Sequence, residues 1–272
     1  MCRHVAYVGP PVPIAAVVLD PPHSLEHQAF AARELISGSV AADGFGAGWM
    51  PVPDGDIATG PALYTSVLPV WADRSFRSVA ARVRSGLVVA NVRNATEAGT
   101  TDHANVHPFT HEDYLFSHNG FIEDFATTMR RTLRARLSDA HYAGLRGMTE
   151  SETLFRLLMT RIDEGRGLVD ALTTTLEETI ALADGLGKEA QLNLIVSDGR
   201  HVVATRMSNR DESNSLYVAS DTARFPDGHL VASEPLDDDL GWRNVDDGAV
   251  VVLDARAGVQ INVPRRVRDA PV

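Results

Sequence analysis

The order of strands and helices along the chain predicts an α+β fold with antiparallel or mixed sheets. Strand-like segments come first, two segments with the apolar spacing of helices lie within residues 151–180, and short strands return over residues 192–263. This order favours sheets that carry helices on their outer faces. Neither a P-loop nor a glycine-rich dinucleotide motif is present. With 272 residues, 44% of them hydrophobic, we expect a single domain over residues 1–272.

The first segments are strand-like and rich in turn residues. Residues 2–8 alternate loosely before Gly9-Pro10-Pro11, which predicts a strand that begins directly after Met1 and ends at these turn residues. Residues 10–22 predict a loop with one helical turn. Residues 44–50 predict a glycine-rich strand whose backbone packs closely against its neighbours.

Two strands in the first half are expected to deliver polar residues. Residues 87–92 are apolar and β-branched apart from one Asn, which predicts a buried strand with Arg93 at its C-terminal end. Residues 114–117 predict a second, short strand that is followed by Asn119 and Gly120.

Helices and further strands make up the second half. Leucine and isoleucine recur at helical spacing from Leu154 to Ile162 and every four residues from Leu168 to Ile180, which predicts two amphipathic helices. The strands expected after them cover residues 192–196, 201–207, 216–220, 230–233, 249–253 and 259–263.

Charge and cysteine content exclude several functional classes. A formal net charge of −11 disfavours binding to nucleic acid, which requires clustered Lys and Arg. One cysteine cannot form an intramolecular disulfide, and the apolar run at residues 14–19 is too short to span or target a membrane. We therefore expect a cytoplasmic protein without nucleic-acid or membrane partners. The sequence does not decide between a monomer and a homo-oligomer.

Cys2 directly follows the initiator methionine. Removal of Met1 would leave a residue that carries both a thiol, with a reference pKa of about 8.5, and an α-amine, with a pKa of about 7.7. Such a residue can act as nucleophile and base near neutral pH. The alternative is that a lone cysteine at position 2 belongs to a chain terminus without a function.

Five short motifs occur in order in the first half of the chain. They cover residues 1–9, residues 42–48, Arg93-Asn94-Ala95-Thr96, Asn105-Val106-His107-Pro108-Phe109 and Ser117-His118-Asn119-Gly120. Taken together they resemble the class II glutamine amidotransferase family, whose mature chains begin with cysteine. The resemblance implies a four-layer αββα N-terminal-nucleophile fold, in which two sheets lie between helices.

The resemblance also implies catalytic roles. Cys2 would be the nucleophile and its α-amine the base. The side-chain amide of Asn119 and the backbone N–H of Gly120 would stabilise the oxyanion, a contribution worth about 10²–10³ in rate. Without the resemblance, Asn119-Gly120 would be read equally well as a type I′ hairpin turn.

Substrate-binding roles follow from the same resemblance. Arg93 would hold the substrate's α-carboxylate with its planar guanidinium, and Thr96 and His107 would shape the pocket. Glu150 matches the position where the family has an aspartate that receives the substrate's α-ammonium group. The longer arm of Glu150 implies either a slightly different pocket geometry or that a neighbouring acid takes this role.

Glu150 also lies where a helix is expected to begin. Thr149-Glu150-Ser151-Glu152 has the spacing of a capping box, in which Thr149 and Glu152 satisfy backbone donors of the first turn. The two interpretations are compatible if Glu152 caps the helix while Glu150 faces the substrate.

Three histidines, His103, His107 and His111, recur every four residues, a spacing that on a helix would suit a metal ion. Pro108 interrupts any such helix. We therefore expect neither a metal ion nor an organic cofactor.

Further segments of the sequence indicate which substrate the protein acts on. Residues 2–6, 43–49 and 231–239, together with Trp242-Arg243, are similar to the branch of the family that hydrolyses γ-glutamyl-hercynylcysteine sulfoxide in ergothioneine biosynthesis. We therefore expect an amidohydrolase that cleaves a γ-glutamyl small molecule into glutamate and an amine. The alternatives are a free-standing glutaminase subunit that supplies ammonia to a partner synthase, and a catalytically silent γ-glutamyl-binding module.

Overall fold

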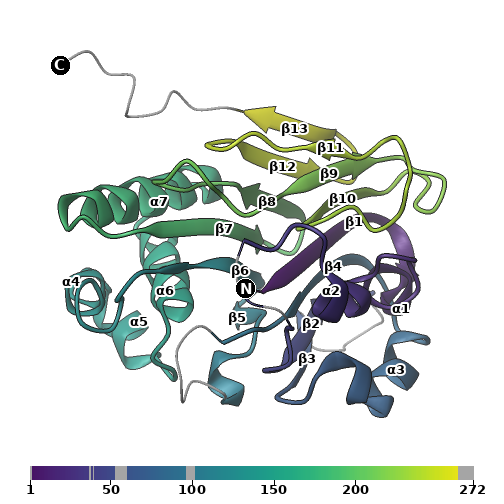
Figure 1. The fold of residues 1–272 in the computed structure, drawn as a ribbon, viewed down its shortest axis with the longest axis horizontal. Coiled ribbons are helices and arrows are strands. Elements are labelled where there is room, and N and C mark those ends of the chain that lie inside the picture. The colour runs from purple at the N-terminus through teal and green to yellow at the C-terminus, as the bar shows by residue number, and fades with distance from the viewer. Residues whose placement is uncertain (1, 37, 39, 53–59, 96–101, 263–272) are drawn as a thin grey trace.

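A computed structural model describes residues 2–36, 38, 40–52, 60–95 and 102–262 of the chain. Within these residues two antiparallel sheets lie face to face (Figure 1). The first sheet has the strand order β11-β9-β10-β1-β4-β2-β3, and the second has the order β13-β12-β8-β7-β6-β5.

The strands of the first sheet come from both halves of the chain. They are β1 (Arg3–Pro13), β2 (Phe45–Trp49), β3 (Ala62–Ser66), β4 (Arg84–Val92), β9 (Tyr217–Ser220), β10 (His229–Ala232) and β11 (Arg243–Asn244). The second sheet contains β5 (Phe109–His111), β6 (Tyr114–Ile122), β7 (Ala190–Ser197), β8 (His201–Thr205), β12 (Val250–Asp254) and β13 (Gly258–Asn262).

Helices flank the pair of sheets on both sides, as Figure 1 shows. Next to the first sheet lie α1 (Ile14–Val18), α2 (Leu25–Ala31), α3 (Arg74–Ala80) and the 3-10 turn η1 (Val70–Ala72). Next to the second sheet lie α4 (Arg130–Arg134), α5 (Asp139–Ala143), α6 (Glu150–Asp163) and α7 (Leu168–Gly185). A second 3-10 turn, η2 (His103–Asn105), precedes β5.

The alternation of side chains along β1 explains the layers. Val5 and Tyr7 belong to the hydrophobic core beneath α1–α3, whereas Ala6 and Val8 belong to a separate core between the two sheets. A third core joins the second sheet to α6 and α7. Since successive residues of a strand face opposite sides, one apolar strand can serve two cores. The predicted four-layer αββα sandwich is confirmed.

The predicted end of the first strand at Gly9-Pro10-Pro11 is wrong, because β1 continues to Pro13. Pairing with β4 shifts register between Val8 and Val12, so the prolines lie at an irregularity where no ladder N–H is required. The expected helical turn nearby is α1.

The predicted boundary after residue 117 is also wrong. Strand β6 runs to Ile122, and Asn119 and Gly120 pair with Asn193 and Leu192 of β7. The sequence Asn-Gly is therefore not a hairpin turn here. A Cβ atom on Gly120 would lie 1.8 Å from the carbonyl oxygen of Gln191, so glycine is required for close backbone packing.

Most other predicted elements are confirmed. The helices from residue 151 and residue 168 are α6 and α7, and the buried strand before Arg93 is β4. The six late strands start and end within two residues of the prediction, apart from residue 263, which lies outside the described residues. Across the described ranges, no helix has the length and apolar character needed to cross a membrane.

Candidate active site

A pocket lies where the ends of β1 and β4 meet the middle of β6 and the first turn of α6. Elements far apart in the sequence meet here because β1 and β4 are central in one sheet, while β6 packs across from them. Its lining residues are Cys2, Arg93, Asn94, Ala95, Asn105, His107, His118, Gly120, Thr149, Glu150 and Ser151.

Cys2 directly precedes β1 and is buried, with 8% of its surface exposed. Its Sγ lies 3.8 Å from the backbone oxygen of Asn94. Burial raises the pKa of the Cys2 thiol, and the positive charge of Arg93 acts in the opposite direction. The thiol is therefore protonated near neutral pH and needs a base to become a nucleophile.

Arg93 follows β4 and is held by the segment before β2. Its backbone N–H donates to the oxygen of Gly44 at 2.8 Å, and its oxygen accepts from Asp43 N–H at 3.0 Å. The Asp43 carboxylate accepts the N–H of Ala95 at 2.8 Å. These bonds fix the turn that carries Arg93 into the pocket. Asp43 thus supports the turn and does not line the pocket.

His118 joins β6 to the start of α6. Its Nε2 lies 3.0 Å from the backbone oxygen of Gln191, and its Nδ1 lies 2.9 Å from Ser151 Oγ. Because the carbonyl oxygen can only accept, Nε2 carries the hydrogen and Nδ1 accepts from the Ser151 hydroxyl. Burial lowers the pKa of His118 to about 4, so the imidazole is neutral at pH 7.

Glu150 and Glu152 lie in the first turn of α6 but have different surroundings. Glu150 lines the pocket, with Oε1 4.0 Å from His118 Nδ1. Thr149 caps the helix by accepting the N–H of Glu152 at 3.3 Å. The Glu152 carboxylate accepts the N–H groups of residues 146 and 147, each at 2.7 Å. The predicted Thr149 cap is confirmed, whereas Glu152 binds the preceding loop and does not complete a capping box.

His107 is almost fully buried at the wall of the pocket, with 3% of its surface exposed. In the part of the chain that the structure describes, neither of its ring nitrogens has a hydrogen-bond partner. Its ring meets that of Phe109 edge-on, with centroids 4.6 Å apart. Burial lowers the pKa of His107 well below its ordinary value, so a neutral ring faces the pocket with a free donor and a free acceptor.

Asn119 faces the layer between the sheets. Its Nδ2 donates to Ser233 Oγ at 3.3 Å, and its side chain is not among the lining residues, whereas Gly120 is. Thr96 lies outside the described residues. Three further residues line the pocket without a predicted role: Asn105 and His118 belong to the family-like motifs of the sequence, whereas nothing in the sequence indicated a role for Ser151.

The three regularly spaced histidines do not share a helix. His103 lies in η2, His107 follows it at the pocket, and His111 lies in β5, where its ring centroid is 5.0 Å from that of His141. The four-residue spacing therefore does not place the three rings on one helical face.

The fold and the site define the class of protein. A cysteine at the start of a central strand, in two sheets enclosed by helices, is the arrangement expected of an N-terminal-nucleophile hydrolase. The family model of class II glutamine amidotransferases matches residues 17–227, and the chain belongs to this family. The prediction of an amidohydrolase of this type is confirmed.

Individual relatives are similar over nearly their full length. The γ-glutamyl-hercynylcysteine sulfoxide hydrolase of Mycolicibacterium smegmatis is 35% identical over 260 residues, covering 95% of this chain and 99% of that protein. The Mycobacterium tuberculosis protein of the same name is 32% identical, covering 98% and 99%. A class-II domain protein from Silicibacter pomeroyi is similar in structure, with a TM-score of 0.69 and 25% identity over 96% of this chain and 99% of that one.

Proposed function

We propose that this protein hydrolyses the γ-glutamyl amide bond of γ-glutamyl-hercynylcysteine sulfoxide, releasing glutamate and hercynylcysteine sulfoxide. The observation that carries the proposal is one buried pocket lined by a thiol, a guanidinium and a carboxylate, from Cys2, Arg93 and Glu150. The two mycobacterial relatives bear the name of this activity. A cytoplasmic location fits a chain whose one cysteine is the nucleophile.

The reaction begins with Cys2 after removal of Met1. The α-amine takes the thiol proton, and Sγ attacks the γ-carbonyl carbon of the substrate. As the tetrahedral intermediate collapses, the carbon–nitrogen bond breaks and the amine returns the proton to the leaving nitrogen. Water then hydrolyses the γ-glutamyl thioester, which releases glutamate and restores the thiol.

The glutamyl head is held by charge. The Arg93 guanidinium offers two parallel hydrogen bonds to the α-carboxylate, and the N-terminus of α6 adds favourable electrostatics for an anion. The Glu150 carboxylate receives the α-ammonium group. His107, with a free donor and a free acceptor, supplies a further polar contact to the substrate.

Negative charge on the carbonyl oxygen is stabilised by β6. Gly120 lines the pocket and provides its backbone N–H. Asn119 does not line the pocket: Nδ2 donates one of its two hydrogens to Ser233 Oγ in the layer between the sheets, so a contribution to the oxyanion requires its side chain to turn toward Gly120 when substrate binds.

The test compares wild type with Cys2→Ala and Cys2→Ser on a panel of γ-glutamyl compounds that includes glutamine. We expect both variants to fold but to be inactive, since the chemistry passes through one sulfur atom. Mass spectrometry should find the wild-type chain starting at Cys2 and should locate a γ-glutamyl adduct there after treatment with an electrophilic glutamine analogue.

Three other results would support a different mechanism or function. Retained Met1 in active protein would reject the α-amine as base. Turnover restricted to glutamine and accelerated by an added synthase would favour the glutaminase subunit. Substrate binding without turnover by correctly processed protein would favour the silent binding module.

A further inference from the structure

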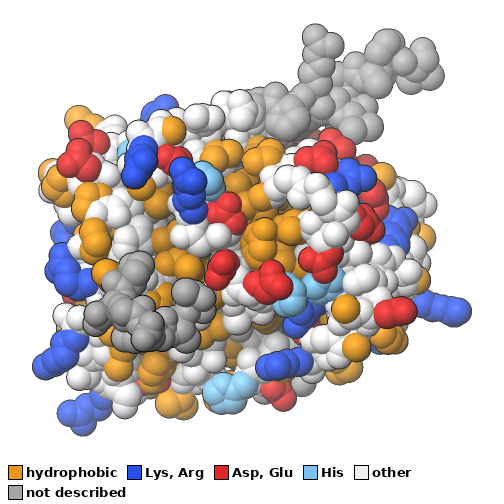
Figure 2. Space-filling model, turned by 180° about the vertical axis from the view of Figure 1, so that it is seen from behind, with side chains coloured by type: hydrophobic (Ala, Val, Ile, Leu, Met, Phe, Trp, Pro, Cys, Tyr) orange, Lys and Arg blue, Asp and Glu red, His pale blue; other side chains and the backbone are white. Residues whose placement is uncertain are grey.

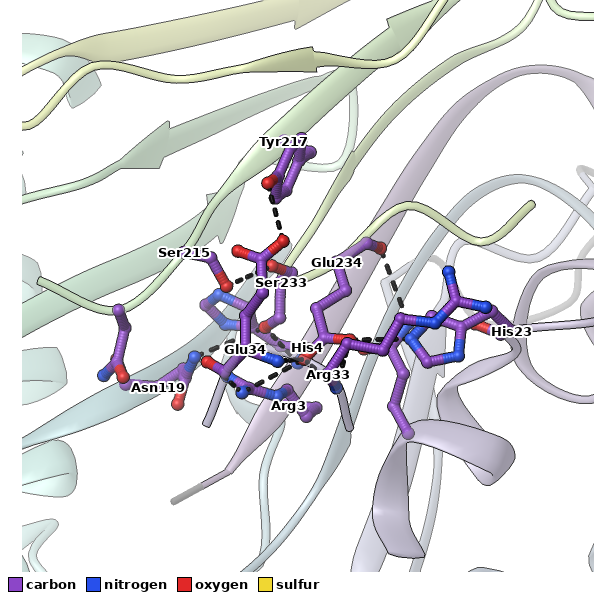
Figure 3. A network of polar contacts seen from close by, with 12 residues as sticks. Arg3, His4, His23, Arg33, Glu34, Asn119, Ser215, Tyr217, Ser233 and Glu234 are labelled. Carbon is purple, nitrogen blue, oxygen red and sulfur yellow. Dashed lines mark hydrogen bonds and ion pairs between the residues drawn. The ribbon is translucent and has the colours of Figure 1, made fainter. Parts of the chain in front are cut away.

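A buried charged cluster surrounds Arg3, the residue that follows Cys2 (Figure 3), and its members Arg3, His23 and Glu234 do not line the pocket. Its centre is Glu234, which directly follows β10 and has 1% of its surface exposed. One carboxylate oxygen lies 3.2 Å from Arg3 Nη2, and the other lies 2.6 Å from His23 Nε2. The backbone N–H groups of Arg33 and Glu34 also donate to it, at 2.9 to 3.1 Å. Four chain segments thus meet at one carboxylate.

Arg3 is the residue that the cluster encloses most completely. Its guanidinium is fully buried, and Nη2 also donates to the backbone oxygen of Glu34 at 2.7 Å. The Glu34 carboxylate accepts in turn from the hydroxyl of Tyr217 at 2.7 Å. Among the described residues, Arg3 Nε and Nη1 have no hydrogen-bond partner, so the Glu234 carboxylate and the Glu34 oxygen are the contacts that compensate this buried charge.

The neighbouring residue, Ser233, binds the start of β1 from the side that faces the second sheet. Its Oγ accepts the backbone N–H of His4 at 3.0 Å and Asn119 Nδ2 at 3.3 Å, and its own N–H donates to the His4 oxygen at 2.9 Å. Residues 233 and 234 therefore bind residues 3 and 4 of the chain from both sides of the sheet. One short segment places both the start of β1 and the side chain of Asn119.

A nucleophile at a chain terminus needs such support. Once Met1 is removed, Cys2 is joined to the protein through Arg3 alone, and terminal residues fray unless they are tied down. Attack requires the sulfur to lie about 3–3.5 Å from the carbonyl carbon, and an error of 1 Å can reduce the rate about 10²-fold. Burying an uncompensated guanidinium is costly, so loss of the Glu234 charge would release Arg3.

We propose that Glu234 is a positioning residue for catalysis: its ion pair with Arg3 fixes the start of β1 and so holds Cys2 at the pocket. Glu234 does not touch the substrate. The role described rests on the proposed function of Cys2, but the placement of the thiol can be measured without any substrate.

The experiment uses Glu234→Gln and Arg3→Lys in the full-length protein. Glu234→Gln removes the negative charge that faces Arg3. Arg3→Lys keeps the positive charge but replaces the guanidinium, whose Nη2 lies 3.2 Å from Glu234 and also donates to the Glu34 oxygen, with a compact ammonium group. We expect kcat to fall about 10- to 100-fold while KM changes less than about threefold, because Arg93 and Glu150, which are proposed to hold the glutamyl head, are unchanged. The double variant should be no slower than the worse single variant, since both act through one contact.

A second readout is the rate at which iodoacetamide alkylates Cys2, the single cysteine of the chain. Release of Arg3 should expose the thiol and raise this rate at least about tenfold. The matched control is Asp73→Asn, which removes another buried carboxylate that accepts a backbone N–H, from Phe76, on the helix side of the same sheet. It should lower thermal stability while leaving kcat and the alkylation rate unchanged.

The outcomes separate the two proposals. Wild type that turns over no γ-glutamyl compound would reject the proposed function, while faster alkylation of Cys2 in both variants would still support the positioning role. Active wild type with unchanged kcat and unchanged alkylation in both variants would overturn the role of Glu234. If Glu234→Gln does not fold, Arg3→Lys alone decides between these results.

Discussion

Glu150 and Glu152 are two residues apart in one helical turn, yet their carboxylates serve different parts of the molecule. The sequence indicated this division, since a first-turn acid can either cap a helix or bind a ligand. The partner of Glu152 was not predictable, because the N–H groups of Arg146 and Gly147 reach it only after the preceding loop has folded back.

The variant Glu150→Gln distinguishes between a role of this side chain in substrate binding and a role in helix stabilisation. If Glu150 receives the α-ammonium group, loss of a charge-assisted hydrogen bond should weaken binding of γ-glutamyl compounds by about 1.5–3 kcal/mol. Steady-state KM and thermal unfolding should be measured on the same preparation, and stability should change little.

Glu152→Gln is the control for that variant. It alters the acid whose carboxylate binds the preceding loop, so stability should fall by more than it does in Glu150→Gln. A stability loss of about 0.3–1 kcal/mol in Glu150→Gln with unchanged KM would instead assign Glu150 to the helix dipole.

Among the elements, β6 departs most from its prediction. The polar run from His118 to Gly120 resembles the end of a strand, but the run pairs with β7 throughout. His118 and Gly120 face the pocket, while Asn119 faces the polar layer between the sheets. A polar stretch can remain in a central strand when both of its faces meet polar partners.

Gly120→Ala should therefore be strongly destabilising. The added Cβ would meet Gln191 O at 1.8 Å and His118 Nε2 at 2.5 Å, and the first of these atoms is backbone that cannot move alone. We expect a loss of more than about 3 kcal/mol in the free energy of unfolding, or no folded protein. Urea unfolding followed by circular dichroism measures it.

Gly185→Ala provides the comparison, because its Cβ would meet no atom within 4 Å at the end of α7. This variant should be unchanged or more stable by about 0.4–1 kcal/mol. Equal stability of the Gly120→Ala variant and wild type would show that β6 and β7 are not packed this closely.

Across the whole molecule, buried ionisable groups link stability to pH. Burial lowers the pKa of His4 to about 3 and that of His118 to about 4. Burial alone would raise the pKa of Glu234, but hydrogen bonds from His23 and two backbone amides, with the charge of Arg3, lower it to about 2. The two histidines stay neutral and the glutamate stays charged well below the pH at which they titrate in the unfolded chain.

The unfolded chain therefore binds more protons than the folded one at acidic pH, and stability should fall as pH decreases. The histidines reduce stability as pH falls from about 6.5 to their folded pKa values, and Glu234 reduces it as pH falls from about 4.5 to about 2. For His118 alone the effect is on the order of 3 kcal/mol. Urea unfolding between pH 7 and pH 4 tests this, with His118→Gln expected to show a flatter profile.

An unfolding free energy that is constant over this range in wild type would contradict the placement of these neutral histidines. On the face in Figure 2, acidic and basic side chains are interspersed, and no continuous basic patch is visible there.

The sequence by itself determined the class of fold, the two long helices and the buried strand before Arg93. These features depend on local periodicity and on residue order, which are present before folding. The role of Cys2 is a prediction that rests on the resemblance of five ordered motifs to one family. Only the tertiary structure decided that Asn119-Gly120 lies within a strand, that Ser151 binds His118, and that Glu234 encloses Arg3. Each of these depends on contacts between residues 33 to 231 positions apart, which no local pattern records.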